Sequence, residues 1–285
     1  MGVIFEPGPR WFRRAEEAIR RALALDSKNA QAKCVRGQIL FTPAKRYQNR
    51  LALRALGEAL RLNPGSQEAR IWQSFVFFHV GLLEEAKEGH LAALATNPDD
   101  ARVLVFLGQT TLHQGNYEEA DEYHARALRI DPASLWANIF LPMLPIYRQQ
   151  PERAAETLAA ATKVLPGEST LASVEAVLWA TRGEKRKAEQ AIQRALRGEK
   201  PLLHTHHMWH WAAAAYALIG KAAPAIRLLR KASEAGLPTY PGFRDDRLLS
   251  PLHGNPQFLR LMADLKREWS SYKREFGHSL PSVAR

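Results

Sequence analysis

Small and bulky residues recur along the chain with a period of 34 residues, and the pattern is clearest from Ala101 to Pro132. A shift of 34 residues in either direction again meets small residues and a proline. These are Gly81, Ala86, Ala93 and Pro98 toward the N-terminus, and Ala154, Ala161 and Pro166 toward the C-terminus. Such a period predicts a stacked array of repeats rather than a compact enzyme domain, because each unit buries its apolar face only against its neighbours.

Each repeat is predicted to contain two helices separated by a turn. In the clearest unit, the apolar spacing predicts one helix over residues 101–114 and another over 117–130, with Gly115 and Asn116 in the turn. Proline cannot continue a helix interior, so a proline-containing pair ends each second helix. These pairs are Asn63-Pro64, Asn97-Pro98, Asp131-Pro132 and Leu165-Pro166.

The clearest unit resembles the tetratricopeptide-repeat family. The residues that carry the resemblance are Leu107, Gly108, Gly115, Tyr117, Ala120, Ala127 and Pro132. The resemblance implies an all-α fold, a tetratricopeptide-repeat solenoid in which antiparallel helix pairs form a right-handed superhelix. By register, we expect about six units over residues 30–238, beginning near residues 30, 67, 101, 135, 169 and 206.

Both ends of the chain depart from a whole repeat. Residues 1–29 follow the spacing of a second helix without its first, so we expect a half repeat whose apolar face allows self-association. At the other end we expect a turn-rich connection over 239–256, a capping helix over 257–276 and a flexible tail over 277–285. Residues 246–265 resemble the end of repeat regions appended to bacterial kinases, cyclases and transcriptional regulators, which implies a larger bacterial regulatory protein.

Three further departures predict local distortions inside the array. Three extra residues within 41–49 are expected to lengthen a turn, and three more fall within 197–206. Pro142 and Pro145 lie where a helix interior is expected. The first helix of that unit should therefore be kinked or shortened.

In the resembled family, the first helices line a concave face that binds peptides. Residues 34 apart would then form ladders along this groove, and here the ladders are mostly apolar and aromatic, which favours a peptide or an amphipathic helix as ligand. The predicted groove residues are Ile71, Phe75, Phe78, His79, Arg102, Val105, Gln109, Leu112, His113, Trp136, Ile139, Met143, Ile146 and Tyr147. The alternative for Phe75 and Phe78 is that they pack between adjacent first helices.

Composition and charge add a second interpretation. The chain is 46% apolar, carries a net charge of +11 and has one cysteine, Cys34, which excludes an intrachain disulfide and fits a reducing cytoplasm. The net charge is +8 over residues 1–66, −6 over 67–168 and +9 over 169–285. The basic ends support an alternative function, a nucleic-acid-binding helical repeat protein.

The sequence contains no motif for catalysis, such as a phosphate-binding glycine loop or a metalloprotease HExxH. His206 and His210, within the histidine-rich stretch that begins at His204, lie one helical turn apart and are the candidates for metal ligands. No nearby acidic residue or cysteine completes a site in the sequence, so neither a metal nor another cofactor is predicted. We therefore expect a non-catalytic cytoplasmic scaffold or adaptor that binds a protein or peptide, without a membrane segment.

Overall fold

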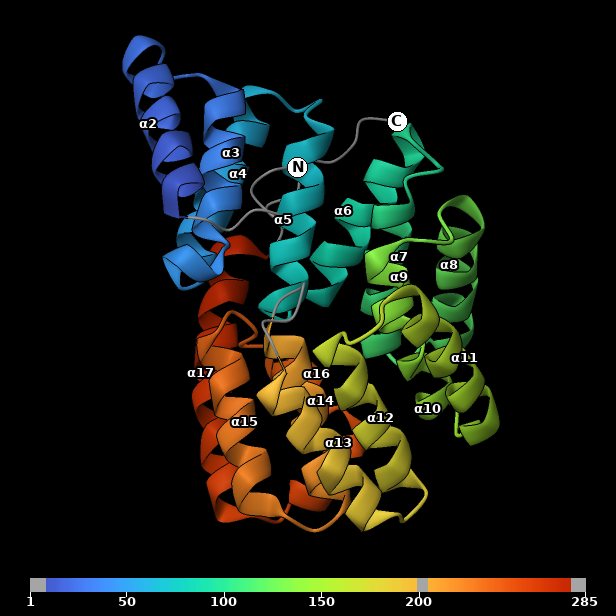
Figure 1. Ribbon diagram of the computed structural model, residues 1–285. Coiled ribbons are helices and arrows are strands. Elements are labelled where there is room, and N and C mark those ends of the chain that lie inside the picture. The colour runs from blue at the N-terminus through green and yellow to red at the C-terminus, as the bar shows by residue number, and fades with distance from the viewer. Residues whose placement is uncertain (1–8, 199–204, 278–285) are drawn as a thin grey trace.

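The computed structural model describes residues 9–198 and 205–277, and within these ranges the regular elements are all helices (Figure 1). They form six consecutive antiparallel pairs, which confirms the predicted all-α solenoid. The pairs are α3 (Ala30–Leu40) with α4 (Asn49–Leu62), α5 (Gln67–His79) with α6 (Leu83–Thr96), α7 (Ala101–His113) with α8 (Tyr117–Ile130), α9 (Leu135–Phe140) and α10 (Met143–Tyr147) with α11 (Pro151–Val164), α12 (Ser169–Thr181) with α13 (Lys185–Arg197), and α14 (Thr205–Leu218) with α15 (Ala222–Glu234).

Further helices flank the six pairs. Helix α2 (Pro9–Leu25) precedes them and packs against α3 through Phe12 and Ile19. The short helices α16 (Tyr240–Arg244) and η2 (Arg247–Leu252) follow them, and the long helix α17 (Pro256–Phe276) comes last. In the part of the chain that the structure describes, no helix is both long and apolar enough to cross a lipid bilayer.

Small residues at the 34-residue interval allow the paired helices to approach closely. The alanines Ala86, Ala120, Ala154 and Ala188 occupy equivalent positions in four second helices, and each is at most 1% exposed. A larger side chain at these positions would separate the helices of a pair. The recurrent small residues in the sequence therefore mark the contacts within the pairs.

Gly108 in α7 shows how closely the helices of one pair pack. A Cβ atom on Gly108 would lie 2.9 Å from both Cε1 and Nε2 of His124 in α8. The His124 side chain is fully buried, and burial lowers the pKa of its imidazole to about 4, so the ring is neutral at pH 7. Nε2 of Gln109 donates to Nε2 of His124 at 3.1 Å, which holds the ring against Gly108.

The structure contains the distortions predicted from the prolines and from the first insertion. Helix α9 ends at Phe140 and α10 begins at Met143, so the first helix of the fourth unit is interrupted at Pro142. The lengthened turn over residues 41–49 contains the short helix η1 (Pro43–Lys45). The second insertion falls largely on residues 199–204, outside the described residues.

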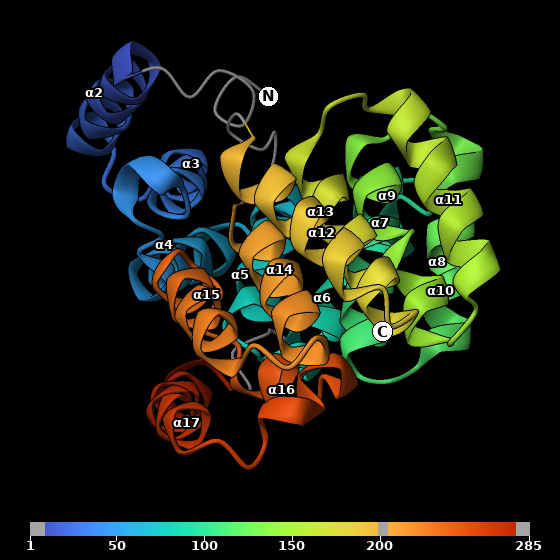
Figure 2. The same cartoon turned by 60° about the horizontal axis from the view of Figure 1, so that its bottom comes forward.

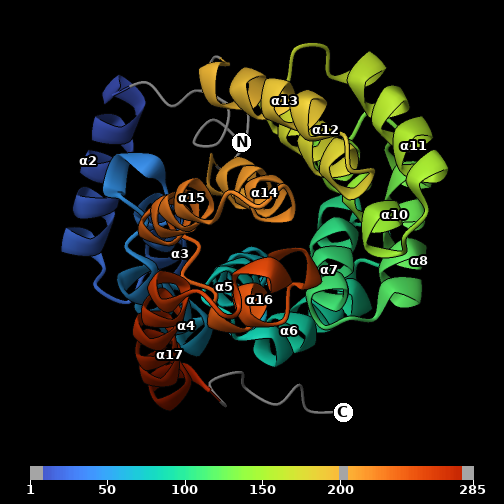
Figure 3. The same ribbon diagram turned by 90° about the horizontal axis from the view of Figure 1, so that it is seen from below.

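The superhelix closes on itself. Figure 3 shows a curved path from α3 to α13, after which α14 and α15 turn inward toward the start of the array. The rings of Tyr47 and His206 are 5.3 Å apart between centroids, and the side-chain amide of Asn49 donates to the carbonyl oxygen of Gly236 at 3.5 Å. The last helix pair therefore contacts the first.

Helix α17 adds a second connection between the two ends of the array. It lies beside α15, as Figure 2 shows, and its Glu275 forms ion pairs with Arg50 and Arg54 of α4. In addition, Nε1 of Trp269 donates to the carbonyl oxygen of Gly81 at 2.9 Å. Helix α17 thus bridges the last unit and the first two units.

The substitution Gly108→Ala tests the close packing within a pair. The new Cβ would clash with the buried His124 ring, so the free energy of unfolding should fall by about 1–3 kcal/mol, as for other overpacked cores. Urea denaturation followed by circular dichroism measures the change. As a control, a Cβ on Gly57 in α4 would come no closer than 3.5 Å to another side chain, so Gly57→Ala should stabilise by about 0.5–1 kcal/mol. Wild-type stability of Gly108→Ala would contradict the observed packing.

Candidate functional site

The inner face of the first helices, where the sequence predicts a binding groove, is covered by the chain itself. Of the predicted groove residues, Ile71, Phe75, Phe78, His79, Val105, Gln109, Leu112, Ile139, Met143, Ile146 and Tyr147 are at most 6% exposed, and Arg102, His113 and Trp136 are half-buried. The expectation of an open groove is therefore corrected, because α14, α16 and η2 return to this face and cover it. Arg102 donates to Glu68 at 3.2 Å, an ion pair between neighbouring repeats.

The predicted groove aromatics pack against other rings of the chain. The ring of Phe75 lies 4.4 Å from that of Phe106 in the neighbouring first helix, which agrees with the alternative considered for this residue. The ring of Phe78 lies 5.2 Å from that of His113 in α7 and 6.4 Å from that of His207 in α14. Phe78 therefore contacts both the next repeat and the returning C-terminal part.

His113 and Tyr147, two polar residues of the predicted groove, belong to a buried cluster around Asp246. The carboxylate of Asp246 accepts a hydrogen bond from Nε2 of His210 at 2.9 Å and from the backbone N–H of Leu248 at 2.9 Å. Burial alone would raise the pKa of Asp246, but the hydrogen bond and charge of His210 outweigh it, so the pKa is lowered. Burial and the nearby Asp246 raise the pKa of Tyr147. The cluster thereby anchors η2 inside the superhelix.

The two candidate metal ligands, His206 and His210, face different partners. His210 donates to Asp246, whereas Nδ1 of His206 donates to the carbonyl oxygen of Ala235 at 2.6 Å. His204, the first histidine of this stretch, lies outside the described residues. The structure therefore does not bring His206 and His210 together as ligands of one ion.

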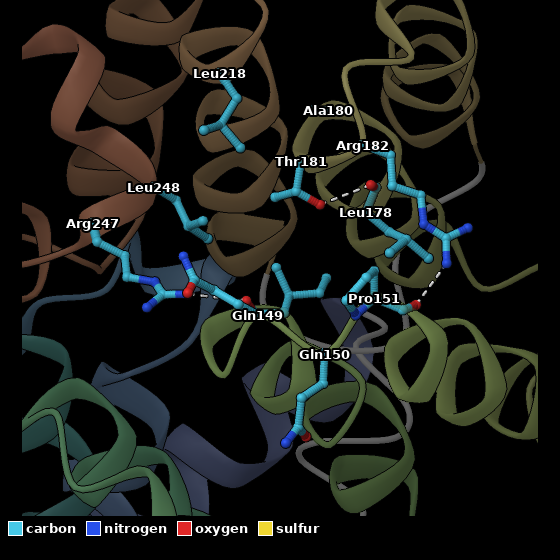
Figure 4. A pocket seen from close by; sticks show the side chains of 11 residues that line it. Gln149, Gln150, Pro151, Leu178, Ala180, Thr181, Arg182, Leu218, Arg247 and Leu248 are labelled. Atoms are coloured by element: carbon cyan, nitrogen blue, oxygen red, sulfur yellow. Dashed lines mark hydrogen bonds between the residues drawn. The ribbon is translucent and has the colours of Figure 1, made fainter.

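An open cleft of about 520 Å³ lies where the turn after α10 meets the ends of α12 and α14 and the helix η2 (Figure 4). We call it the rim cleft. Its lining residues are Ile146, Gln149, Gln150, Pro151, Leu178, Ala180, Thr181, Arg182, Leu218, Arg247 and Leu248. The volume is within the range of about 300–1,000 Å³ that is typical of ligand sites. Of the predicted groove residues, Ile146 lines this cleft.

Two arginines provide the charge of the rim cleft. The guanidinium of Arg182 donates to the carbonyl oxygen of Pro151 at 2.8 Å, and that of Arg247 donates to the carbonyl oxygen of Ile146 at 3.3 Å. A guanidinium has five N–H donors, so each arginine retains donors beyond these bonds. The described lining residues include no carboxylate. The cleft therefore suits an anionic group placed next to aliphatic side chains.

The rim cleft contains a residue in a strained backbone conformation. Gly81, Gly115 and Gly183 occupy equivalent turns and have φ angles of 80°, 83° and 76°. Gln149 takes the corresponding place in the fourth unit, with a φ angle of 58°. The left-handed conformation costs a non-glycine residue roughly 1–2 kcal/mol, and such strain is often found at functional sites. The 34-residue register contains this signal, which our sequence analysis missed.

A model of the tetratricopeptide-repeat family matches residues 90–134. These residues therefore belong to the tetratricopeptide-repeat family, and the chain has the tetratricopeptide-repeat fold. Outside residues 90–134, the likeness is one of fold, because the helix pairs resemble those of solved tetratricopeptide-repeat structures. Among curated proteins, none matches the sequence.

Three solved structures illustrate the likeness of this fold to others. A tetratricopeptide-repeat protein from Parabacteroides merdae is 16% identical, with 90% of this chain and 92% of that chain covered and a TM-score of 0.60. TTC0263 from Thermus thermophilus is 21% identical, with 72% and 98% covered and a TM-score of 0.51. In the Cut9-Hcn1 structure, the matched chain is 14% identical, with 96% and 53% covered and a TM-score of 0.55. At these identities the likeness shows the fold alone.

The substitution Asp246→Ala tests the buried cluster. It would remove the carboxylate partner of His210 and the side-chain cap of η2, so the free energy of unfolding should fall by about 3–5 kcal/mol. The neighbouring Asp245 is exposed and pairs with Arg244 at the surface, so Asp245→Ala should change stability by less than about 0.5 kcal/mol. Urea denaturation of both variants gives the comparison. Equal effects would show that Asp246 does not hold η2 in place.

Proposed function

We propose that this tetratricopeptide-repeat protein is a non-catalytic interaction scaffold that binds an extended peptide in the rim cleft. The repeat fold supports a protein-interaction scaffold in general. The proposal of a peptide ligand in the rim cleft rests on the composition of this cleft. Its lining combines aliphatic side chains with two arginines, and the described lining residues include no carboxylate. We infer a partner with aliphatic side chains next to an acidic side chain or a C-terminal carboxylate.

A second cleft extends the surface available to such a peptide. It has a volume of about 580 Å³ and is formed by α11, α12 and α13, with Leu158 and Trp179 among its lining residues. Leu178 and Arg182 line both this cleft and the rim cleft, so the two are neighbours along the end of α12. A peptide longer than the rim cleft can therefore continue over α12 and use the Trp179 ring as an apolar contact.

The predicted groove is a less suitable binding surface in the closed superhelix. A ligand at Phe75 or Phe78 would have to displace the parts of the chain that cover them, whereas the rim cleft is already open. Self-association through the N-terminal half repeat remains a prediction, supported by Trp11 and Leu25 of α2, which are 51% and 90% exposed. Membership in a larger bacterial regulatory protein also remains a prediction.

Peptide selection tests the proposed ligand. Random 12-residue peptides displayed on phage are selected on the purified protein, and fluorescent copies of the enriched peptides are measured by fluorescence polarisation. We expect enriched peptides to combine Leu or Ile with Asp, Glu or a free C-terminal carboxylate. The double variant Arg182→Glu/Arg247→Glu should bind them at least about tenfold more weakly, because it replaces attraction by repulsion.

A charge reversal outside the cleft is the matched control. Arg260 is exposed on α17, so Arg260→Glu should retain wild-type affinity. Wild-type affinity of the double variant would contradict the rim cleft as the binding site.

A fluorescent single-stranded DNA in the same assay tests the alternative function, nucleic-acid binding. DNA binding that falls steeply with salt and is tighter than peptide binding would favour nucleic acid as the ligand.

A further inference from the structure

Three buried histidines from distant parts of the sequence meet inside the superhelix. His79 is the last residue of α5, and His206 and His207 lie in the first turn of α14. One ring nitrogen of each lies within 4.8 Å of those of the other two, and the ring centroids are 4.6–5.3 Å apart. All three side chains are at most 4% exposed. We call these three residues the histidine cluster.

Two members of the histidine cluster have the tautomer that metal ligands need. Nδ1 of His79 donates to the carbonyl oxygen of Phe75 at 2.7 Å, and Nδ1 of His206 donates to that of Ala235 at 2.6 Å. A neutral imidazole with its proton on Nδ1 has the lone pair that binds a metal ion on Nε2. Histidines that bind metals typically donate their other nitrogen to a carbonyl or carboxylate oxygen, which fixes the tautomer and the direction of the ring. His79 and His206 both show this arrangement.

We propose that the histidine cluster binds one divalent transition-metal ion of the zinc class. Imidazole nitrogens suit Zn²⁺, Cu²⁺, Ni²⁺ and Fe²⁺, whereas Mg²⁺ and Ca²⁺ prefer oxygen ligands. Metal–nitrogen distances of about 2.0–2.1 Å in a tetrahedral site place the nitrogens about 3.4 Å apart. From the observed separations, each nitrogen has to move inward by roughly 0.8 Å or less to reach this geometry.

The ligand set defines the kind of site. Among the described residues, the group that could hold the ion consists of the three histidines, which supply three of the four positions of a tetrahedral ion. The fourth position belongs to water or to an additional donor. Because the ligands come from α5 and α14, the bound ion would connect the second helix pair to the last one. The bound ion would thereby stabilise the closed superhelix.

Ordinary aromatic packing is the competing explanation for the histidine cluster. The ring of His79 lies 4.9 Å from that of Phe41, and the ring of His206 lies 5.3 Å from that of Tyr47, both in edge-on contacts. Packing alone would give no saturable affinity for metal ions. The two explanations therefore differ in a direct binding measurement.

Metal titration of the full chain tests the proposal. Protein without an affinity tag is stripped with a chelator and titrated with Zn²⁺ in a calorimeter at pH 7.5, and Co²⁺ is added in parallel for visible spectroscopy. We expect one ion per chain, the intense absorption of tetrahedral Co²⁺, and a Tm that rises with zinc concentration. Affinity should decrease at pH 5.5, because protons compete for the imidazoles. No saturable binding, or no effect of zinc on Tm, would overturn the proposal.

Two variants locate the site and one serves as a control. His79→Gln and His207→Gln should each lower the zinc affinity at least tenfold. His90→Gln removes a histidine that is equally buried, but in α6 and outside the cluster, so it should retain the wild-type affinity. Unchanged affinity in both cluster variants would assign the metal to other histidines and overturn the proposal. Should these variants not fold, the wild-type Co²⁺ spectrum decides, since an octahedral spectrum excludes the site.

Discussion

Burial of the inner face of the first helices against the C-terminal third of the same chain is the interaction on which the rest of the structure depends. In a stacked array, each unit covers its apolar surface with its neighbours and leaves one face of the superhelix open. Here that face contains large side chains such as Phe75, Phe78 and Met143, all at most 4% exposed. Each fully buried side chain of this size contributes about 1.5–3 kcal/mol. Closure therefore stabilises the array and removes its central groove.

The helix pairs were predictable because they depend on residues close in sequence. The 34-residue register indicated the alanines that allow paired helices to pack closely, and Pro142 indicated the interruption between α9 and α10. Closure was not predictable in this way, since it depends on the curvature accumulated over all the units. His79 and His113 were predicted to line a binding groove. In the structure, His79 is buried beside α14, and His113 belongs to the cluster around Asp246.

Departures from the repeat provide many of the contacts that distinguish this molecule. Tyr47 lies in the lengthened first turn and reaches His206 of α14. Asp246 lies in the connection after the last pair and binds His210. Gln149 replaces a turn glycine and lines the rim cleft. A residue that breaks the register is thus a better indicator of specific contacts here than a residue that follows it.

The distance between the N-terminal end of α6 and helix α16 tests closure of the superhelix most directly. Spin labels are attached at Glu84→Cys and Arg244→Cys, with the buried Cys34 replaced by serine, and their separation is measured by pulsed electron paramagnetic resonance. Glu84 and Arg244 are exposed residues that line one cleft of about 400 Å³. The closed superhelix predicts a single, narrow distribution at short distance. A broad distribution at long distance would show that the C-terminal part does not cover the inner face, and would contradict this account.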